Sequence, residues 1–274
     1  MRRIAHLSDL HFGRHDMIVV DGLSAALTAI RPDAVVISGD LTQRARHSQF
    51  AAARLFIDGL RAAGLPVIVV PGNHDVPLWD LTRRFLSPLA RFRSYIEPHP
   101  YPLFADEKVA ILGLNTARSL TIKDGRVSDQ QMLCIRERFA EAPRSARRML
   151  VTHHPLVELP WGEDGEKLDA AGRSDAALQT ALEAGVHLLL AGHHHRPFSG
   201  SAATFLTAGH SMLVVQAGTT TSTRLREHAN SFNLIETEGE RLRVAVHAWT
   251  EGGFTEAADE RYRFADGRWH EAWA

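Results

Sequence analysis

Short apolar runs alternate with amphipathic stretches along most of the chain. Runs rich in valine, isoleucine and leucine are predicted as buried strands, because each is too short for a helix and is bounded by polar or turn-forming residues. These runs are Ile4–Leu7, Ala34–Ser38, Val67–Val70, Val109–Leu114, Met149–Thr152 and Val186–Ala191.

Three of the intervening stretches carry helix signals. Ser48–Ala63 places apolar residues on one face and ends before Gly64, which is a typical helix stop. Ser128–Ala140 begins with the serine and glutamine spacing of a capping box. Ser174–Ala184 ends at Gly185. The alternation of strands and helices predicts an α/β fold.

The pattern changes after about residue 200, where strands and turns replace the helices. Met212–Ala217, Phe232–Glu236 and Leu242–Ala248 read as strands, the last two joined by a hairpin at "TEGE". Since there is no repeat and no linker-like segment, we expect a single domain over residues 1–274. Residues 225–274 are expected to be a β-rich extension of a sheet, or a cap.

Composition narrows the possible functions. The chain has 274 residues, is 45% hydrophobic and carries a net charge of −1, so no field of one sign recruits nucleic acid. Cys134 is the only cysteine, which excludes a disulfide within the chain and any thiolate metal cluster. No apolar run approaches the ~18 residues of a membrane span, and the N-terminus lacks a secretory pattern. We therefore expect a cytoplasmic protein without membrane or nucleic-acid partners.

Polar clusters follow five of the predicted strands directly. They read "SDLH", "SGD", "PGNHD", "THHP" and "GHHH" in chain order. Because the carboxyl ends of strands in an α/β sheet line one crevice, these distant clusters are expected to meet. Their potential ligands are Asp9, His11, Asp40, Asn73, His74, Asp75, His153, His154, His193, His194 and His195.

The chemistry of this cluster indicates metal ions. Oxygen and imidazole donors without thiolate suit Mn, Fe, Zn or Co. Carboxylates and imidazoles crowded together would be costly to bury without cations, which argues for more than one ion. We predict two transition-metal ions, divalent or trivalent.

The ordered set of D-x-H, G-D, G-N-H-D, H-x-P and G-H-x-H, spanning residues 9 to 195, resembles the calcineurin-like metallophosphoesterases. The resemblance implies a four-layer αββα sandwich of two mixed sheets flanked by helices. It also implies that Asp40 bridges two metals, that His74 faces the substrate and that Asp75 orients His74. The implied ligands are Asp9, His11, Asp40 and His195 for one metal, and Asp40, Asn73, His153 and His193 for the other.

Two such cations can share a water, lower its pKa and present the hydroxide to a phosphorus atom. The spacing of "GDLTQRARHSQF", "PGNHDVP" and "THHPL" is most similar to bacterial cyclic-nucleotide and glycerophosphodiester phosphodiesterases. That similarity implies a small phosphodiester substrate, with 3',5'-cyclic AMP as the favoured candidate. A broad phosphomonoesterase is the alternative, and a non-catalytic scaffold disagrees with the complete set of motif residues. A homo-oligomer is compatible with the sequence.

Other polar residues carry weaker signals. His6, His187 and His247 are expected to be structural, and Asn115 to be a turn residue at a strand end. His15, His47, His99, His228 and His270 read as surface or rim positions, with His47 a possible substrate contact. Roles for His154 and His210 stay open, as do those of the acidic loop from Trp161 to Glu166 and of Gly218–Arg224, which suits phosphate contacts or a turn. In "GHHH", an extended backbone would point His193 and His195 to one side and His194 to the other.

Overall fold

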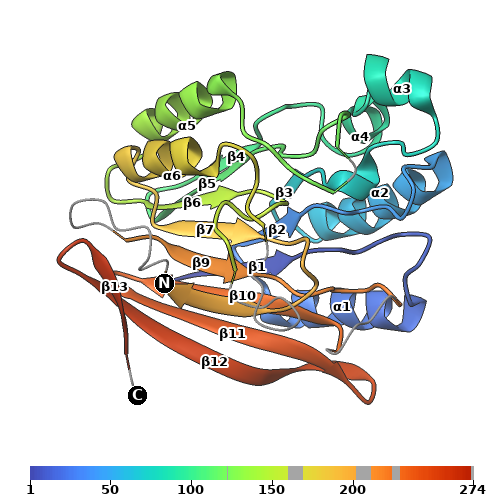
Figure 1. Ribbon diagram of the computed structural model, residues 1–274. Coiled ribbons are helices and arrows are strands. Elements are labelled where there is room, and N and C mark those ends of the chain that lie inside the picture. The colour runs from blue at the N-terminus through green and yellow to red at the C-terminus, as the bar shows by residue number, and fades with distance from the viewer. Residues whose placement is uncertain (122, 160–168, 202–210, 224–228, 273–274) are drawn as a thin grey trace.

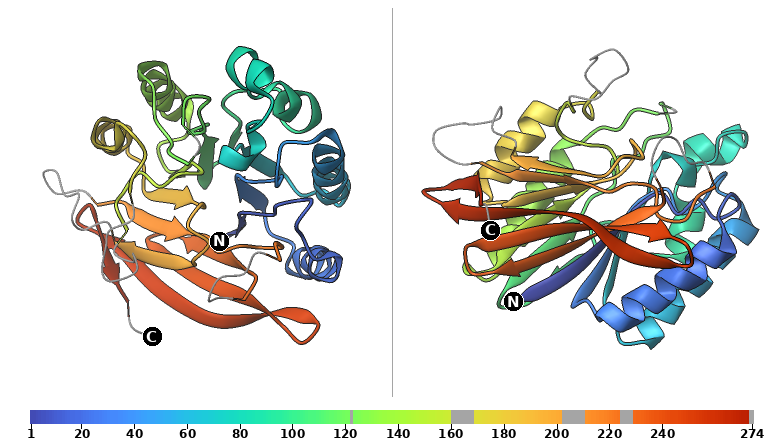
Figure 2. Two further views of the ribbon diagram at one scale, coloured as in Figure 1. Left: turned by 45° about the vertical axis from the view of Figure 1, so that its right-hand side comes forward. Right: turned by 90° about the horizontal axis from the view of Figure 1, so that it is seen from below.

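Two mixed β-sheets lie face to face at the centre of the computed structural model, and helices cover both outer faces (Figure 1). The view in Figure 2 separates the layers, with α5 and α6 on one side and α1 and α2 on the other. This is the αββα sandwich that the family resemblance implies. The structure describes residues 1–121, 123–159, 169–201, 211–223 and 229–272.

Each sheet combines a parallel centre with antiparallel strands. In the seven-stranded sheet, of order β13-β12-β11-β10-β1-β2-β3, strands β1 to β3 are parallel and β10 to β13 continue it antiparallel. In the six-stranded sheet, of order β4-β5-β6-β7-β9-β8, only the outer strands β4 and β8 are antiparallel. The strands are β1 Arg2–Leu7, β2 Ala34–Ser38, β3 Val67–Val70, β4 Leu103–Ala105, β5 Val109–Gly113, β6 Arg147–Val151, β7 Leu188–Ala191, β8 Phe198–Ser201, β9 Leu213–Gln216, β10 Ser231–Glu238, β11 Arg241–Thr250, β12 Gly253–Ala265 and β13 Arg268–Glu271.

The helices are α1 Met17–Ile30, α2 His47–Ala62, α3 Leu81–Leu86, α4 Ala90–Tyr95, α5 Asp129–Glu141 and α6 Ser174–Glu183, and Asn73–Asp75 form the 3-10 turn η1. The expected capping box of α5 is present. Ser128 Oγ accepts from the Gln131 amide at 3.3 Å, and Gln131 Oε1 accepts from the Ser128 amide at 2.9 Å. Gly64 and Gly185 follow α2 and α6 with positive φ, as helix-stopping glycines do.

Three apolar layers hold the sandwich together. Between the sheets, residues such as Ile4 and Val36 pack against Met149 and Leu190. Their neighbours along each strand point outward, because side chains alternate across a sheet. One outward layer packs against α1, α2 and α4, and the other packs against α5 and α6. Burial on both faces explains why the parallel strands are almost purely apolar.

The structure adds elements that the sequence patterns did not specify. Helix α1 contains Gly22, and a Cβ built there would lie 2.1 Å from the Trp249 ring of β11. The glycine that weakens the helical pattern therefore allows α1 to pack closely against the sheet. Strand β7 begins at Leu188, later than expected, because the Val186 amide still donates to Ala181 at the end of α6. Within the described stretches after residue 200, the regular elements are all strands.

Among the residues that the structure describes, no helix combines the length and apolar content needed to cross a membrane.

Candidate metal centre

The polar clusters found in the sequence lie together at one edge of the sandwich. Strands β1, β2 and β3 run parallel, as do β5, β6, β7 and β9, so their carboxyl ends face the same way. The loops that leave β1, β2, β3, β6 and β7 carry every expected ligand. Side chains almost two hundred residues apart in the sequence thereby come within a few ångströms of one another.

One group of donor atoms surrounds Asp9. Its Oδ1 lies 3.5 Å from Nε2 of His11 and 3.6 Å from Nε2 of His195. The His11 Nε2 is also 3.8 Å from Oδ2 of Asp40. Asp9, His11 and Asp40 are fully buried, whereas His195 lies at the mouth of the site.

A second group surrounds His153. Its Nε2 lies 3.5 Å from Oδ1 of Asp40, 3.1 Å from Oδ1 of Asn73 and 3.3 Å from Nδ1 of His193. Asp40 therefore offers one carboxylate oxygen to each group. This is the position that the resemblance assigns to a bridging ligand.

The donor atoms fit transition-metal ions. Nitrogen and oxygen ligands about 2.1 Å from an ion are about 3.0 to 3.4 Å apart in octahedral or tetrahedral geometry, close to the separations seen here. Asp9 Oδ1 and both ring nitrogens of His11 are buried without a hydrogen-bond partner. Buried polar atoms normally have partners, so Asp9 Oδ1 and His11 Nε2, which face each other, match the ligands of an ion.

At Asp9 and His193, electrostatics favour the protonation states that metal ligands need. Burial alone would raise the pKa of Asp9, but the imidazoles of His195, His11 and His153 lower it well below its usual value. Burial and the neighbouring histidines, His153 first, lower the pKa of His193 far below its ordinary value. At neutral pH the carboxylate is therefore ionised and the His193 imidazole neutral.

Hydrogen bonds on the far side of two histidines orient their rings. His153 Nδ1 lies 2.8 Å from the carbonyl oxygen of Ser38, so this nitrogen donates and Nε2 keeps its lone pair for the site. His195 Nδ1 bonds to the hydroxyl of Thr219, and its Nε2 faces Asp9. Such partners fix the tautomer and orientation of metal-binding histidines.

His74 and Asp75 differ from the sequence expectation in how they are held. The His74 amide donates to Asp40 Oδ1 at 2.8 Å, and its Nδ1 donates to the Gln43 carbonyl at 2.9 Å. Asp75 accepts instead from the amides of Leu41, Thr42 and Gly72 and from the Thr42 hydroxyl, at 2.9 to 3.1 Å.

The prediction that Asp75 orients the His74 ring is therefore wrong. Consecutive side chains in a 3-10 turn point about 120° apart, so the carboxylate faces the loop after β2 rather than the imidazole. Asp75 ties that loop, which carries Asp40, to the turn at Gly72. Burial, together with the charge of Asp40, raises the pKa of Asp75 to about 6.

Glycines in three of the motifs lie directly against candidate ligands. A Cβ on Gly72 would be 2.1 Å from Oδ1 of Asp40, and one on Gly39 would be 2.6 Å from the His153 ring. One on Gly192 would be 1.8 Å from Oγ of Ser8 and 3.0 Å from Oδ2 of Asp9. The motif glycines thus leave room for the ligands to converge.

The backbone at the ligand positions is left-handed rather than extended. Asp9, His11, Asp40, His193 and His195 have φ angles between 49° and 78°. The expected strand-like alternation through "GHHH" is therefore wrong. His193 and His195 nevertheless reach different donor groups, near His153 and Asp9 respectively.

His194, between these two residues, was expected to face the opposite side. It is half-buried and stays next to the His193 ring. Its ring centroid lies 5.0 Å from that of His193.

Several residues surrounding the site were given only weak roles by the sequence. Buried threonines after β9 brace the loop that carries Asp9 and His11, because the Thr220 hydroxyl accepts from the Ser8 amide at 3.1 Å and Thr221 donates to the Leu10 carbonyl at 2.8 Å. The run of threonines directly after β9 is the feature of the sequence that could have indicated this bracing role. Arg224, the last residue of the Gly218–Arg224 stretch, lies outside the described residues. The same holds for His210, His228 and the acidic loop from Trp161 to Glu166.

The remaining histidines divide into packed and peripheral ones. His6 is buried and its Nε2 bonds to Ser38 Oγ at 3.0 Å, while the exposed His47 contacts the Tyr95 hydroxyl at 3.2 Å. His154 bonds to the Thr116 hydroxyl at 2.8 Å, and its ring centroid is 4.6 Å from that of His193. Asn115 acts as a turn residue, because its side chain accepts from the amide two residues on.

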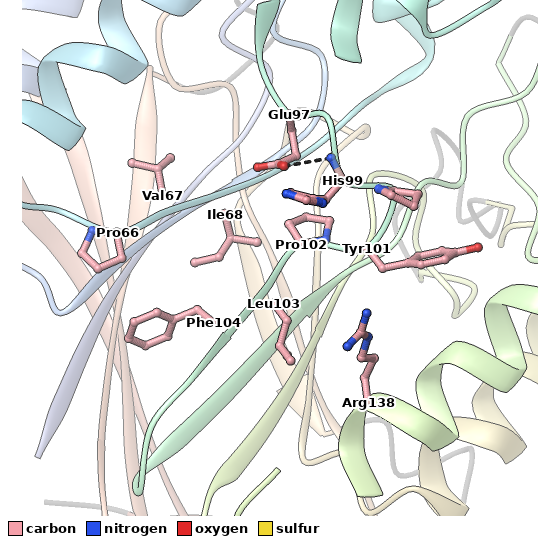
Figure 3. A pocket seen from close by; sticks show the side chains of 11 residues that line it. Pro66, Val67, Ile68, Glu97, His99, Tyr101, Pro102, Leu103, Phe104 and Arg138 are labelled. Atoms are coloured by element: carbon pink, nitrogen blue, oxygen red, sulfur yellow. Dashed lines mark hydrogen bonds between the residues drawn. The ribbon is translucent and has the colours of Figure 1, made fainter. Parts of the chain in front are cut away.

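A cavity of about 350 Å³ lies apart from this centre, beside β3 (Figure 3). Glu97, His99, Tyr101 and Arg138 line it together with apolar residues from β3 and β4, and none of the candidate ligands does. The Glu97 carboxylate accepts from the His99 amide at 3.0 Å. His99 therefore lies away from the candidate metal centre.

Comparisons with known proteins agree with this geometry. Residues 2–197 match the family model of the calcineurin-like phosphoesterases. The chain is 29% identical over 208 residues to the 3',5'-cyclic adenosine monophosphate phosphodiesterase of Escherichia coli strain K12, covering 71% of this chain and 70% of that one. It is 24% identical over 226 residues to a probable glycerophosphodiester phosphodiesterase of Arcobacter nitrofigilis, covering 81% and 75%.

Among solved structures, a purple acid phosphatase from yellow lupin seeds superposes with a TM-score of 0.71 at 14% identity. The superposition covers 94% of this chain but only 53% of the lupin protein. At this identity the likeness concerns the fold.

Proposed function

Because the chain belongs to the calcineurin-like phosphoesterase family, we propose that it hydrolyses a small phosphodiester with two transition-metal ions. The observation that carries this proposal is the position of Asp40, whose two carboxylate oxygens face separate groups of donors. A single bound ion would leave one of these buried groups without its partner.

Under this proposal Asp9, His11, Asp40 and His195 hold one ion, and Asp40, Asn73, His153 and His193 hold the other. Bound there, two ions would polarise the phosphoryl oxygens and activate water for attack on phosphorus. The protein's part is to fix the ligands before the substrate arrives. The Ser38 carbonyl does this for His153, and the Thr219 hydroxyl does it for His195.

His74 supplies the proton chemistry in this proposal. The Gln43 carbonyl holds the proton on Nδ1, so Nε2 is the nitrogen that can exchange a proton with the leaving oxygen. The amide of His74 is bonded to the bridging carboxylate, which fixes the distance between imidazole and metal centre. Asp75 contributes through the main chain, by holding the loop on which Asp40 lies.

The relatives support a diester as substrate. Both curated relatives described above are named for phosphodiesterase activity, one on 3',5'-cyclic AMP and one on glycerophosphodiesters. We favour 3',5'-cyclic AMP, because that relative has the higher identity. The leaving group is read by loops rather than by the metal ligands, so the substrate has to be measured.

The test compares matched diesters and monoesters with the purified protein. Rates on bis(p-nitrophenyl) phosphate, p-nitrophenyl phosphate, cyclic AMP, cyclic GMP and glycerophosphodiesters are measured with Mn, Fe, Zn and Co in turn. We expect diesters to be hydrolysed faster than monoesters, with cyclic AMP among the better substrates. Equal or faster rates on monoesters would favour the monoesterase alternative.

Metal content and variants test the centre itself. Protein purified without chelators should hold close to two transition-metal ions per chain. Asp40→Ala should lose metal and activity together, whereas His74→Ala should keep the metals and lose at least about 100-fold in kcat. His99→Ala, in the cavity of Figure 3, is the matched histidine control and should retain both. Protein that binds no metal and stays inactive with all four would refute the proposal.

A further inference from the structure

Large apolar side chains remain exposed around the short helix α3. Trp79 is 82% exposed and Leu86 is 81% exposed, and Leu81 and Phe85 of the same helix are more than half exposed. Leu120, in the loop after β5, is 77% exposed. Such residues commonly occur singly on surfaces, but contiguous apolar patches mark interaction sites.

Arg84 joins these residues into one surface. Its side chain is buried under α3 and donates to the carbonyls of Pro77 at 3.0 Å, Ser119 at 2.7 Å and Thr121 at 2.5 Å. Leu120 lies between the last two acceptors, so the guanidinium fixes it beside the helix. Trp79, Leu81, Phe85, Leu86 and Leu120 are called the α3 patch below.

The segments that carry the α3 patch are connected to the candidate metal centre. Trp79 follows Asp75 by four residues along the chain. The loop that carries Leu120 begins at Thr116, whose hydroxyl bonds to His154, and returns at Gly125, which packs against the same ring. Both ends of the loop that carries Leu120 are therefore anchored at His154, whose ring centroid lies 4.6 Å from that of the candidate ligand His193.

Charge identifies the class of partner. Residues 76–95 contain four arginines and one aspartate, and residues 116–126 contain three basic residues and one aspartate. Because Arg84 is buried under α3, the two segments present a formal charge of +4 at the surface, whereas the whole chain carries −1. In a two-fold dimer each patch would meet its own copy, and two segments of the same positive charge would repel.

We infer that the α3 patch docks on the surface of an anionic phospholipid bilayer. Trp, Phe and Leu side chains enter the boundary between headgroups and acyl chains, and neighbouring Arg and Lys residues bind anionic headgroups. The expectation of no membrane partner rested on the lack of a spanning segment, and a patch built from residues 79–86 and 120 contains no such run. The inference concerns a surface and does not depend on the proposed phosphodiesterase activity.

Vesicle sedimentation tests the inference on the full-length protein. Binding is measured to vesicles of phosphatidylcholine alone and to vesicles of phosphatidylcholine and phosphatidylglycerol in equal parts. We expect binding at least about tenfold tighter to the anionic vesicles, weakened by added salt. Subtracting the fluorescence spectrum of Trp79→Phe from that of the wild type gives the emission of Trp79. This emission should shift to shorter wavelengths when anionic vesicles are added.

Variants show whether the α3 patch carries the binding. The double variant Trp79→Ser with Phe85→Ser should bind about 100-fold more weakly, because two aromatic side chains no longer leave water. Leu133→Ser, an exposed apolar residue on α5, is the matched control and should bind like the wild type. Circular dichroism and thermal melting confirm that the variants are folded.

Three results would overturn the inference. One is no binding to either kind of vesicle. Another is binding that the patch variants leave unchanged. The third is concentration-dependent dimerisation without lipid, seen by analytical ultracentrifugation and abolished by the same variants, which would identify the surface as a self-association interface.

Discussion

Replacing Gly72 by alanine perturbs the candidate centre at one defined point. The backbone of Gly72 is extended, with φ of −105°, so alanine adopts it without strain. The added Cβ, however, would lie 2.1 Å from Oδ1 and 2.4 Å from the amide nitrogen of Asp40. Any effect of the substitution therefore comes from this contact.

The size of the effect follows from the distance. To reach ordinary van der Waals separation, the carboxylate of Asp40 has to move by about 1 Å relative to Gly72. Misplacement of a catalytic group by about 1 Å costs on the order of 100-fold in rate. We expect Gly72→Ala to lower kcat/KM on bis(p-nitrophenyl) phosphate by about 100-fold and to reduce the bound metal below two ions per chain.

Metal analysis, steady-state kinetics and thermal unfolding are measured together on the variant. Gly59→Ala is the matched control, because nothing lies within 4 Å of its Cβ and the position is inside α2. It should keep full activity and gain up to about 1 kcal/mol in stability from the better helix propensity of alanine. If Gly72→Ala retains two metals and activity within a factor of two, Asp40 does not bridge the two donor groups as proposed.

Three further predictions concern histidines of the site and the core. Thr219→Val should weaken metal binding about 10- to 100-fold in a chelator competition, because it removes the hydroxyl that orients His195, whereas Thr219→Ser should retain affinity within a few-fold. By elemental analysis, His193→Ala should lose one metal per chain and His194→Ala should keep both. Equal metal losses in the two variants would contradict the proposal that His193 is a ligand and His194 is not. Burial lowers the pKa of His6 to about 3, below its unfolded value near 6.5, so its contribution to stability is present above pH 6.5 and lost as the pH falls toward 3. Urea titrations at pH 7 and pH 5 measure how much the free energy of unfolding decreases between the two pH values. This decrease should be about 2 kcal/mol smaller in His6→Gln than in wild type. An equal decrease in both proteins would contradict the assignment to His6.

The sequence was sufficient to predict which segments form the central parallel strands and that the polar clusters meet at their carboxyl ends. Strands buried on both faces leave uninterrupted apolar runs, and a candidate ligand follows each of these runs within two or three residues of the strand end. Ser38 and the following Asp40 show the pattern: the strand stops where the site begins. This is why short motifs far apart in the chain could be assigned to one place.

The packing partners of those motifs could not be predicted in the same way. Gly22 weakens a helix in the sequence, and its use depends on Trp249 at the other end of the chain. Asp75 is next to His74 in the sequence, but the 3-10 turn directs its carboxylate to Leu41 and Thr42. In both cases the partner is selected by tertiary structure, which local spacing does not record.

The left-handed backbone of the ligand loops accounts for the threonines around them. A residue other than glycine in this conformation costs about 1 kcal/mol, less for aspartate, and the loop after β1 has two such residues in Asp9 and His11. That strain persists only where the surroundings hold the loop in place. Thr220 and Thr221 bond to the main chain on either side of Asp9, and each bond contributes about 1 kcal/mol. The hydroxyls therefore offset the strain that brings the ligands together, which gives the threonine run after β9 a function without any contact to phosphate.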